Sequence, residues 1–276
     1  MSFKFLSVIL FASLSVCAKA QLTETYEHKG EYGASIGVAH YFGDLNPNAA
    51  INKPKFSGGI FYKRQLNNYI GIKASGNYSL LGYSDAYSKD SAQRIRNLSF
   101  NSNVWEVSLS GDFNFFKFYP ELPEYRFTPY VSLGIGVMHF DPYTYIDGTK
   151  VFLRDLGTEG QGRTDYPDRK KYSKYALIVP IGFGFKYNIT NEINLFGELT
   201  YRFTSTDYLD DVSTTYVTPD VGNFKSNQIN QLSDRSGVYG YTHAPGQQRG
   251  NSTQKDAYAT LQIGISVNIQ DYKCPF

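Results

Sequence analysis

Eight segments of the chain alternate, residue by residue, between apolar side chains and small or polar ones. They cover residues 32–42, 56–65, 70–80, 104–115, 130–137, 175–188, 193–203 and 260–270. A period of two places the two sets of side chains on opposite faces of a β-strand, whereas a helix repeats every 3.6 residues. Most segments have about the ten residues that a tilted strand needs to cross a bilayer. The pattern therefore predicts an all-β protein.

The polar face of these segments consists largely of small side chains. In the fifth segment, Val131, Leu133 and Ile135 alternate with Ser132 and Gly134. A soluble sandwich also alternates, but its polar face meets bulk water. Small side chains suit the interior of an eight-stranded barrel, which is just wide enough for side chains to fill it. Tyrosine and phenylalanine cluster at the segment ends, where transmembrane barrels carry aromatic girdles. These features favour a membrane barrel.

The connections between the segments alternate in length. Long ones cover residues 43–55, 82–103, 139–174 and 204–257, and the others cover 66–69, 116–128 and 189–192. Outer-membrane barrels have this asymmetry because long loops face outside and short turns face the periplasm. The sequence thus predicts an eight-stranded antiparallel up-and-down transmembrane β-barrel with long extracellular loops and short periplasmic turns. Both termini are expected in the periplasm, and the longest loop is expected to be largely mobile.

The first twenty residues have the features of a signal peptide. Lys4 precedes an apolar run over residues 5–16, and Ala18 and Ala20 occupy the two positions read by a signal peptidase. The run is too short for a transmembrane helix, which needs about 20 apolar residues. We therefore expect cleavage before Gln21 and export of the protein.

A lipoprotein signal is the weaker alternative, because the bulky Val16 precedes Cys17. Loss of Cys17 with the signal leaves Cys274 as the only cysteine, so no internal disulfide can form. The expected organisation is a signal peptide over 1–20, a periplasmic segment over 21–30, the barrel over 31–270 and a periplasmic tail over 271–276.

Seven charged residues lie on the lumen-facing side of the predicted strands. They are Lys63, Lys73, Glu106, Asp112, Lys186, Glu198 and Arg202. A buried charge is costly without a partner, so opposite signs in one narrow tube should pair across strands. We favour a salt-bridged plug that blocks the barrel over the alternative of a selective channel for small solutes.

Three carboxylates follow the seventh segment, at Asp207, Asp210 and Asp211. They are weak candidates for a divalent cation, and we favour a solvated turn in which aspartates bond local backbone N–H groups. The basic run 169–171 could contact lipopolysaccharide phosphate or be a solvated loop. The net charge of +2 argues against nucleic-acid binding. No catalytic or cofactor motif is evident, so we expect a non-enzymatic protein without a cofactor.

Several short sequences resemble PorG-like proteins of the type IX secretion system. They are YFGDLNP at 41–47, RFTPY at 126–130, LGIGV at 133–137, PIGFGFKYN at 180–188 and TDYLDDV at 206–212. The resemblance implies an outer-membrane barrel of Bacteroidota-type bacteria that works in protein secretion and often in gliding motility. It also implies association with a periplasmic ring of PorK-like lipoprotein and PorN-like subunits, which the barrel tethers to the outer membrane.

The connection between the fourth and fifth segments is the largest expected on the periplasmic side, and its aromatic residues and prolines suit a protein contact. The candidate contact residues are Phe116, Phe118, Tyr119, Pro120, Leu122 and Tyr125. These aromatics could equally belong to the inner girdle. The alternatives to a secretion scaffold are a small solute-conducting or ligand-binding barrel and a barrel that contacts lipopolysaccharide or adheres through its long loops.

Overall fold

The computed structural model describes residues 28–120, 122–220 and 224–270. The predicted signal peptide over 1–20, most of the segment 21–30 and the tail over 271–276 lie outside these residues. Within the described residues, no helix has the length and apolar character needed to span a membrane.

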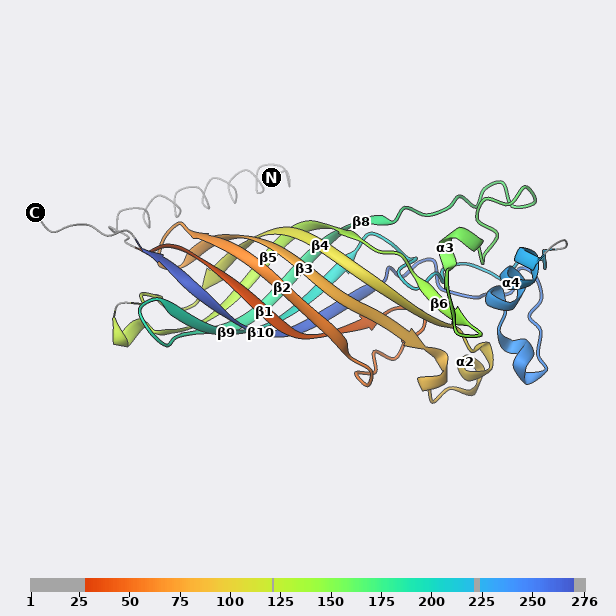
Figure 1. Cartoon of the computed structure of the whole chain (residues 1–276), viewed down its shortest axis with the longest axis horizontal. Helices are drawn as coiled ribbons and strands as arrows, with labels where there is room; N and C mark the ends of the chain where they lie inside the picture. Colours follow the sequence, from red (N-terminus) through yellow and green to blue (C-terminus); the bar gives the residue numbers. More distant parts are fainter. Residues whose placement is uncertain (1–27, 121, 221–223, 271–276) are drawn as a thin grey trace, which may run out of the picture.

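Eight long strands form a closed antiparallel barrel (Figure 1). They are β1 (His28–Phe42), β2 (Lys55–Gln65), β3 (Ile70–Ser84), β4 (Ser99–Asn114), β5 (Phe127–His139), β8 (Tyr175–Asn188), β9 (Ile193–Thr204) and β10 (Ala257–Gln270). Each strand pairs with its neighbour in this order, and β10 pairs with β1 along its length. Closure leaves no free edge along the barrel wall. The predicted fold class is confirmed.

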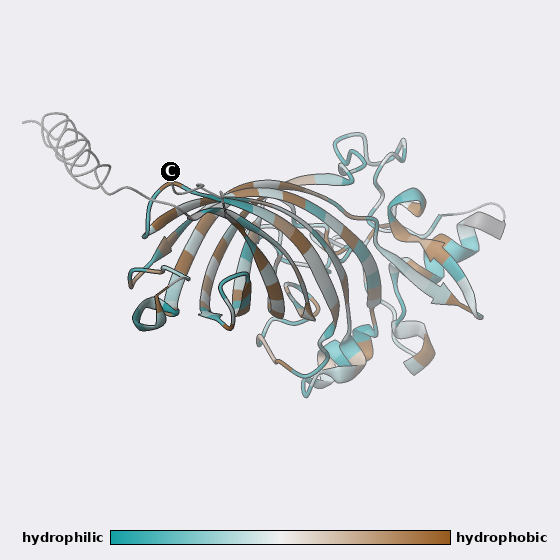
Figure 2. Cartoon of the chain, turned by 60° about the vertical axis from the view of Figure 1, so that its left-hand side comes forward, coloured by the Kyte–Doolittle hydropathy of each residue, from teal (hydrophilic) through white to brown (hydrophobic). Residues whose placement is uncertain are grey.

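Hydrophobic and hydrophilic residues alternate along the strands (Figure 2), and the two faces of the wall differ accordingly. Leu133 and Ile135 are 61% and 69% exposed on the outer face, whereas Ser132 is 5% exposed on the inner face. A Cβ at the inward Gly134 would lie 2.6 Å from the carbonyl oxygen of Leu109, so the wall there has no room for a side chain. A continuous apolar outer face of this kind is stable in lipid, whereas soluble monomers rarely expose such large patches.

Aromatic rings surround the barrel near both ends of this apolar surface. At one end, the rings of Tyr78 and Trp105 have centroids 4.6 Å apart, and those of His139 and Tyr175 are 5.0 Å apart. At the other end lie Tyr32, Tyr62, Phe113, Phe127 and Tyr187, all of them exposed. Two aromatic belts, one toward each end of the strands, are the arrangement found at the two interfaces of a bilayer.

The two ends of the barrel are built differently (Figure 1). One end, the turn end, carries the connections 66–69, 115–126 and 189–192, with η2 (Pro123–Tyr125) in the second. The other end carries the connections 43–54, 85–98, 140–174 and 205–256, which we call the cap.

The cap contains short elements that the sequence pattern did not predict. They are η1 (Asp85–Tyr87), α2 (Ser91–Arg96), β6 (Tyr143–Ile146), β7 (Thr149–Phe152), α3 (Leu153–Leu156), α4 (Phe224–Ser233) and η3 (Ser236–Tyr239). β6 and β7 form a hairpin that extends from β4. None of these elements is long enough to show a clear hydrophobic period.

The apolar core of the protein lies in the cap and at the adjoining strand ends. Leu45, Leu98, Leu153 and Leu209 come from the four different connections of the cap, and each is at most 5% exposed. The expectation that 204–257 is largely mobile is therefore wrong for the described part of this segment. Its apolar side chains pack against the other connections and bury surface that would otherwise face water.

Candidate functional site

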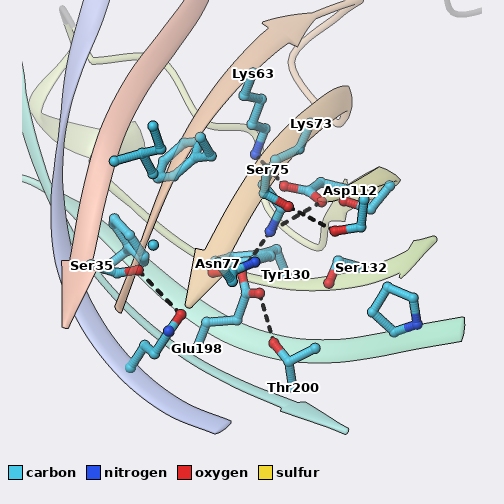
Figure 3. Close-up of a pocket in the computed structure, with 18 of the residues that line it drawn as sticks. Ser35, Lys63, Lys73, Ser75, Asn77, Asp112, Tyr130, Ser132, Glu198 and Thr200 are labelled. Carbon is cyan, nitrogen blue, oxygen red and sulfur yellow. Dashed lines mark hydrogen bonds and ion pairs between the residues drawn. The ribbon is translucent and has the colours of Figure 1, made fainter. Parts of the chain in front are cut away.

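The barrel interior is the first candidate site, because eight charged side chains line one internal pocket. Figure 3 labels four of them, Lys63, Lys73, Asp112 and Glu198. Four are acids and four are bases: Glu31, Glu106, Asp112, Glu198, Lys63, Lys73, Lys186 and Arg202. Seven of them are the residues that the sequence places in the lumen. Glu31 was missed because the first segment was started at Tyr32, although Glu31 continues the inward-facing alternation by one more strand position.

Six of these charges form a chain of alternating sign across the lumen. In order they are Lys186, Glu31, Lys63, Asp112, Lys73 and Glu198. At one end of the chain, Glu31 Oε1 lies 2.5 Å from Lys186 Nζ and 3.5 Å from Lys63 Nζ. The members belong to six different strands, so the chain links opposite walls of the barrel.

The other half of the chain centres on Asp112 and Lys73. Asp112 lies 2.9 Å from Lys63 Nζ and 3.7 Å from Lys73 Nζ, and Lys73 Nζ lies 2.8 Å from Glu198 Oε2. Tyr130 donates a hydrogen bond of 2.6 Å to the same oxygen of Glu198. Each charge therefore faces a partner of opposite sign, as a low-dielectric interior requires.

Arg202 and Glu106 form a separate buried ion pair nearer the cap. The Arg202 guanidinium also donates to Thr260 Oγ1 at 2.7 Å, and Tyr258 donates to Glu106 Oε2 at 2.8 Å. Arg202 and Tyr258 are register partners on β9 and β10. The Arg202–Glu106 ion pair is thus enclosed by neighbouring strands.

Little free space is left among these side chains. The pocket that they line has a volume of about 50 Å³. Since one water needs about 10–15 Å³ of such volume, this space holds roughly three to five waters. The geometry is that of a salt-bridged interior with room for only a few waters, and it resembles a plug more than a channel for hydrated solutes.

The connection 115–126 closes the turn end of the lumen. Phe118 is completely buried, and its ring lies 4.4 Å from Lys186 Nζ. The N–H of Phe116 donates to Thr128 Oγ1 at 3.1 Å, which holds the start of the connection against β5. The aromatic ring thus covers the last charge of the lumen chain, an arrangement stabilised by cation–π attraction.

This position corrects part of the predicted partner surface. Phe118 and Pro120 are buried in the barrel and cannot contact a partner, so the interpretation of these two residues was wrong. Tyr119 and Tyr125 are half-buried in the same connection. The best-exposed side chains of the predicted set are Phe116 and Leu122.

The three aspartates of the cap do not form the solvated turn that we favoured from the sequence. Asp207, Asp210 and Asp211 are buried, with at most 4% of each exposed. Ser213 donates to Asp207 at 2.5 Å, and Tyr172 donates to Asp211 at 2.6 Å. Burial raises the pKa of both Asp207 and Asp211 to about 6. Across the described residues, no cluster of three or more His, Cys, Asp or Glu side chains is suited to hold a metal ion.

One cluster in the cap brings together the residue types of a hydrolase. His243 Nδ1 lies 3.0 Å from Asp234 Oδ1 and 3.2 Å from Ser236 Oγ. A serine–histidine–aspartate relay uses opposite ring nitrogens for the serine and the acid. Here both partners approach the same nitrogen and Ser236 is buried, so the cluster stabilises the turn and does not form such a relay.

The chain matches the model of a family described as "Domain of unknown function (DUF6089)" over residues 3–248. It belongs to this family. None of the curated proteins matches the sequence.

Several solved barrels are similar to the chain at low identity. Neisserial surface protein A is 12% identical, with a TM-score of 0.44, and the match covers 87% of this chain and 97% of that one. The attachment invasion locus protein Ail of Yersinia pestis is 12% identical, with a TM-score of 0.39 and coverage of 87% and 99%. The outer membrane protein OprG of Pseudomonas aeruginosa is 10% identical, with a TM-score of 0.38 and coverage of 89% and 98%.

Proposed function

We propose that this DUF6089 protein is a non-enzymatic scaffold barrel of the outer membrane, part of a type IX secretion system, that tethers a periplasmic ring of PorK-like and PorN-like subunits. In this proposal the turn end and both termini face the periplasm, and the cap faces outside. The proposal includes a role in gliding motility through the same secretion system.

The observation that carries the proposal is the filled lumen. A barrel whose interior holds paired charges and about 50 Å³ of free space leaves little room for a hydrated solute. This favours a function at the ends of the barrel and on its lipid-facing wall. A membrane-embedded anchor uses these surfaces, and the resemblance of the sequences at 41–47 and 206–212 to PorG-like proteins supports an anchor of the type IX secretion system.

The alternatives have less support from the geometry. A solute channel is disfavoured by the filled lumen. Lipopolysaccharide contact through the run 169–171 is disfavoured because Arg169 donates to the carbonyl of Glu159 at 2.7 Å and to Thr215 Oγ1 at 2.7 Å. Lys171 likewise donates to the carbonyl of Asp155 at 3.1 Å. Two of the three basic side chains are thus engaged within the cap.

The turn end offers a defined place for the ring contact. Leu122 projects from the connection 115–126 with 46% of its surface exposed, close to the 48% of Leu66 in the neighbouring turn. Burial of such an exposed apolar side chain against a partner is favourable. Leu66 and Leu122 therefore form a matched pair for a test.

Leu122→Asp is expected to lower the recovery of ring subunits with the solubilised barrel by about tenfold, since a charged side chain at an apolar contact costs more than ~1.4 kcal/mol. Leu66→Asp is the control and should retain recovery near the wild-type level. The measurement is quantitative mass spectrometry of proteins that co-purify from detergent-solubilised outer membrane. Wild-type recovery in both variants would remove the connection 115–126 from the contact.

Deletion of the gene tests the function itself. We expect loss of secreted substrates from the culture medium while the barrel-assembly machinery remains intact. A normal set of secreted proteins together with altered solute uptake would reject the scaffold and favour a conducting barrel.

A further inference from the structure

Three side chains from distant parts of the chain meet where the cap joins the barrel. Tyr41 ends the inward-facing side of β1, Asp210 lies in the connection 205–256, and Asp256 directly precedes β10. The hydroxyl of Tyr41 lies 2.5 Å from Asp210 Oδ2 and 3.0 Å from Asp256 Oδ1. All three are nearly inaccessible to solvent. We call them the Tyr41 cluster.

The number of protons in this cluster is fixed by its hydrogen bonds. A phenol carries one O–H, so Tyr41 can donate to only one of the two carboxyl groups. The second short contact would join two oxygens without a hydrogen between them if both aspartates were ionised. It becomes a hydrogen bond when that carboxyl group is protonated and donates to the Tyr41 oxygen.

The other carboxyl oxygens of the cluster are already used as acceptors. Asp256 Oδ2 accepts from the N–H of Leu209 at 2.9 Å, and Asp210 Oδ1 accepts from the N–H of Val212 at 2.9 Å. These bonds fix both carboxyl groups so that their remaining oxygens face Tyr41. The bond from Leu209 to Asp256 also joins the start of the longest cap segment to its end, directly before β10.

The charges around the cluster do not neutralise it. Asp44, Asp207 and Arg96 act on it electrostatically, and Asp211 and Lys255 adjoin it in the sequence. Asp85, Glu159 and Arg249 act in turn on these neighbours. Arg96 binds Asp85 at 2.7 Å, and Arg249 binds Glu159 at 2.9 Å. Within the described ranges, neither Asp210 nor Asp256 forms an ion pair.

The Tyr41 cluster also has little free space around it. A Cβ at Gly43 would overlap both Asp256 Oδ1 and the Tyr41 hydroxyl, so the backbone of Gly43 closes the cluster from that side. Two unpaired carboxylates in so tight a site would repel each other strongly. A shared proton removes the repulsion without needing room for another group.

We propose that Asp210 and Asp256 share one proton across Tyr41 at neutral pH, and that this protonated cluster fastens the cap to the barrel as a pH-sensitive lock. Burial and the mutual repulsion of the two groups raise the pKa of Asp210, and burial and neighbouring acids raise that of Asp256. A group whose pKa is higher in the folded state stabilises that state at low pH and loses the contribution as pH rises through the folded pKa. Rising pH should therefore loosen the cap.

Infrared spectroscopy of the purified mature barrel in detergent at pH 8 tests the shared proton. Asp207 and Asp211, with pKa values of about 6, are then about 99% ionised. We expect a carboxylic-acid C=O band that disappears in Asp256→Asn and equally in Asp210→Asn, because one remaining carboxylate can accept the Tyr41 proton alone. Asp207→Asn is the matched control and should retain the band.

Limited proteolysis of the cap from pH 5.5 to 9, corrected with an unfolded peptide substrate, tests the lock. The wild-type rate of cleavage within 205–256 should rise as the proton is lost. The rise should be about tenfold for each unit by which the folded pKa of the cluster exceeds its unfolded pKa. Asp256→Asn should flatten this rise. A wild-type spectrum without the band at pH 8, a band that survives both substitutions, or protection that depends on added divalent cations and not on pH would overturn the proposal.

Discussion

Arg202→Met will destabilise the barrel by about 3–5 kcal/mol, because it leaves Glu106 as an unpaired charge in the lumen. Methionine keeps much of the volume of arginine, so the loss comes mainly from charge and hydrogen bonds. Thr260 loses its hydrogen-bond donor at the same time, and the Tyr258 ring loses the guanidinium that lies 5.2 Å from its centroid. The readout is the urea midpoint at which the heat-modifiable folded form in lipid vesicles converts to the unfolded form.

The double variant Arg202→Met/Glu106→Gln separates the contribution of the ion pair to stability from that of side-chain packing. Removing both charges should restore most of the lost stability, since an uncompensated buried charge no longer exists. Arg64→Met, at an exposed position of β2, is the surface control and should change the unfolding free energy by less than about 0.5 kcal/mol. If Arg202→Met alone were as stable as wild type, the Arg202–Glu106 pair would be solvated by water in the lumen.

Phe118→Ala will destabilise the turn end by about 3–5 kcal/mol, the usual cost of truncating a buried phenylalanine. The ring is fully buried and lies over Lys186, so its removal both opens a cavity and exposes the end of the charge chain to water. The same urea titration measures the loss, and protease cleavage within 115–126 should accelerate.

Two substitutions serve as controls for Phe118. Phe118→Leu retains most of the apolar volume and should cost less than about 1.5 kcal/mol. Phe116→Ala removes a ring that is 56% exposed in the same connection, and its effect should be small. If Phe116→Ala were the more damaging change, the connection would not close the lumen in the way described.

The barrel could be predicted from the sequence because the membrane constrains both faces of every strand. Lipid requires apolar side chains outside, and the narrow lumen requires small or paired side chains inside, so the alternation persists over each of the eight strands. The partners of Lys63 and Lys186 could not be predicted in this way. They depend on the register of strands that are far apart in the sequence, and on Glu31 at a strand position just before the clear alternation begins.

The cap could not be predicted because its core is assembled from irregular segments. Leu45, Leu98 and Leu209 each stand alone among polar neighbours, and their burial depends on the other connections. An Asp-rich turn has the same local sequence whether it faces water or a folded cap. The burial of Asp210, and its meeting with Tyr41, therefore appear only in three dimensions.

The filled lumen is the central claim, and single-channel recording tests it most directly. Purified wild-type protein would be inserted into planar lipid bilayers, with insertion verified in parallel vesicles by the heat-modifiable folded form. We predict no stable conductance steps, because paired charges and Phe118 fill the interior and leave only enough space for a few waters. Reproducible steps of uniform size from the folded wild-type barrel would contradict the account.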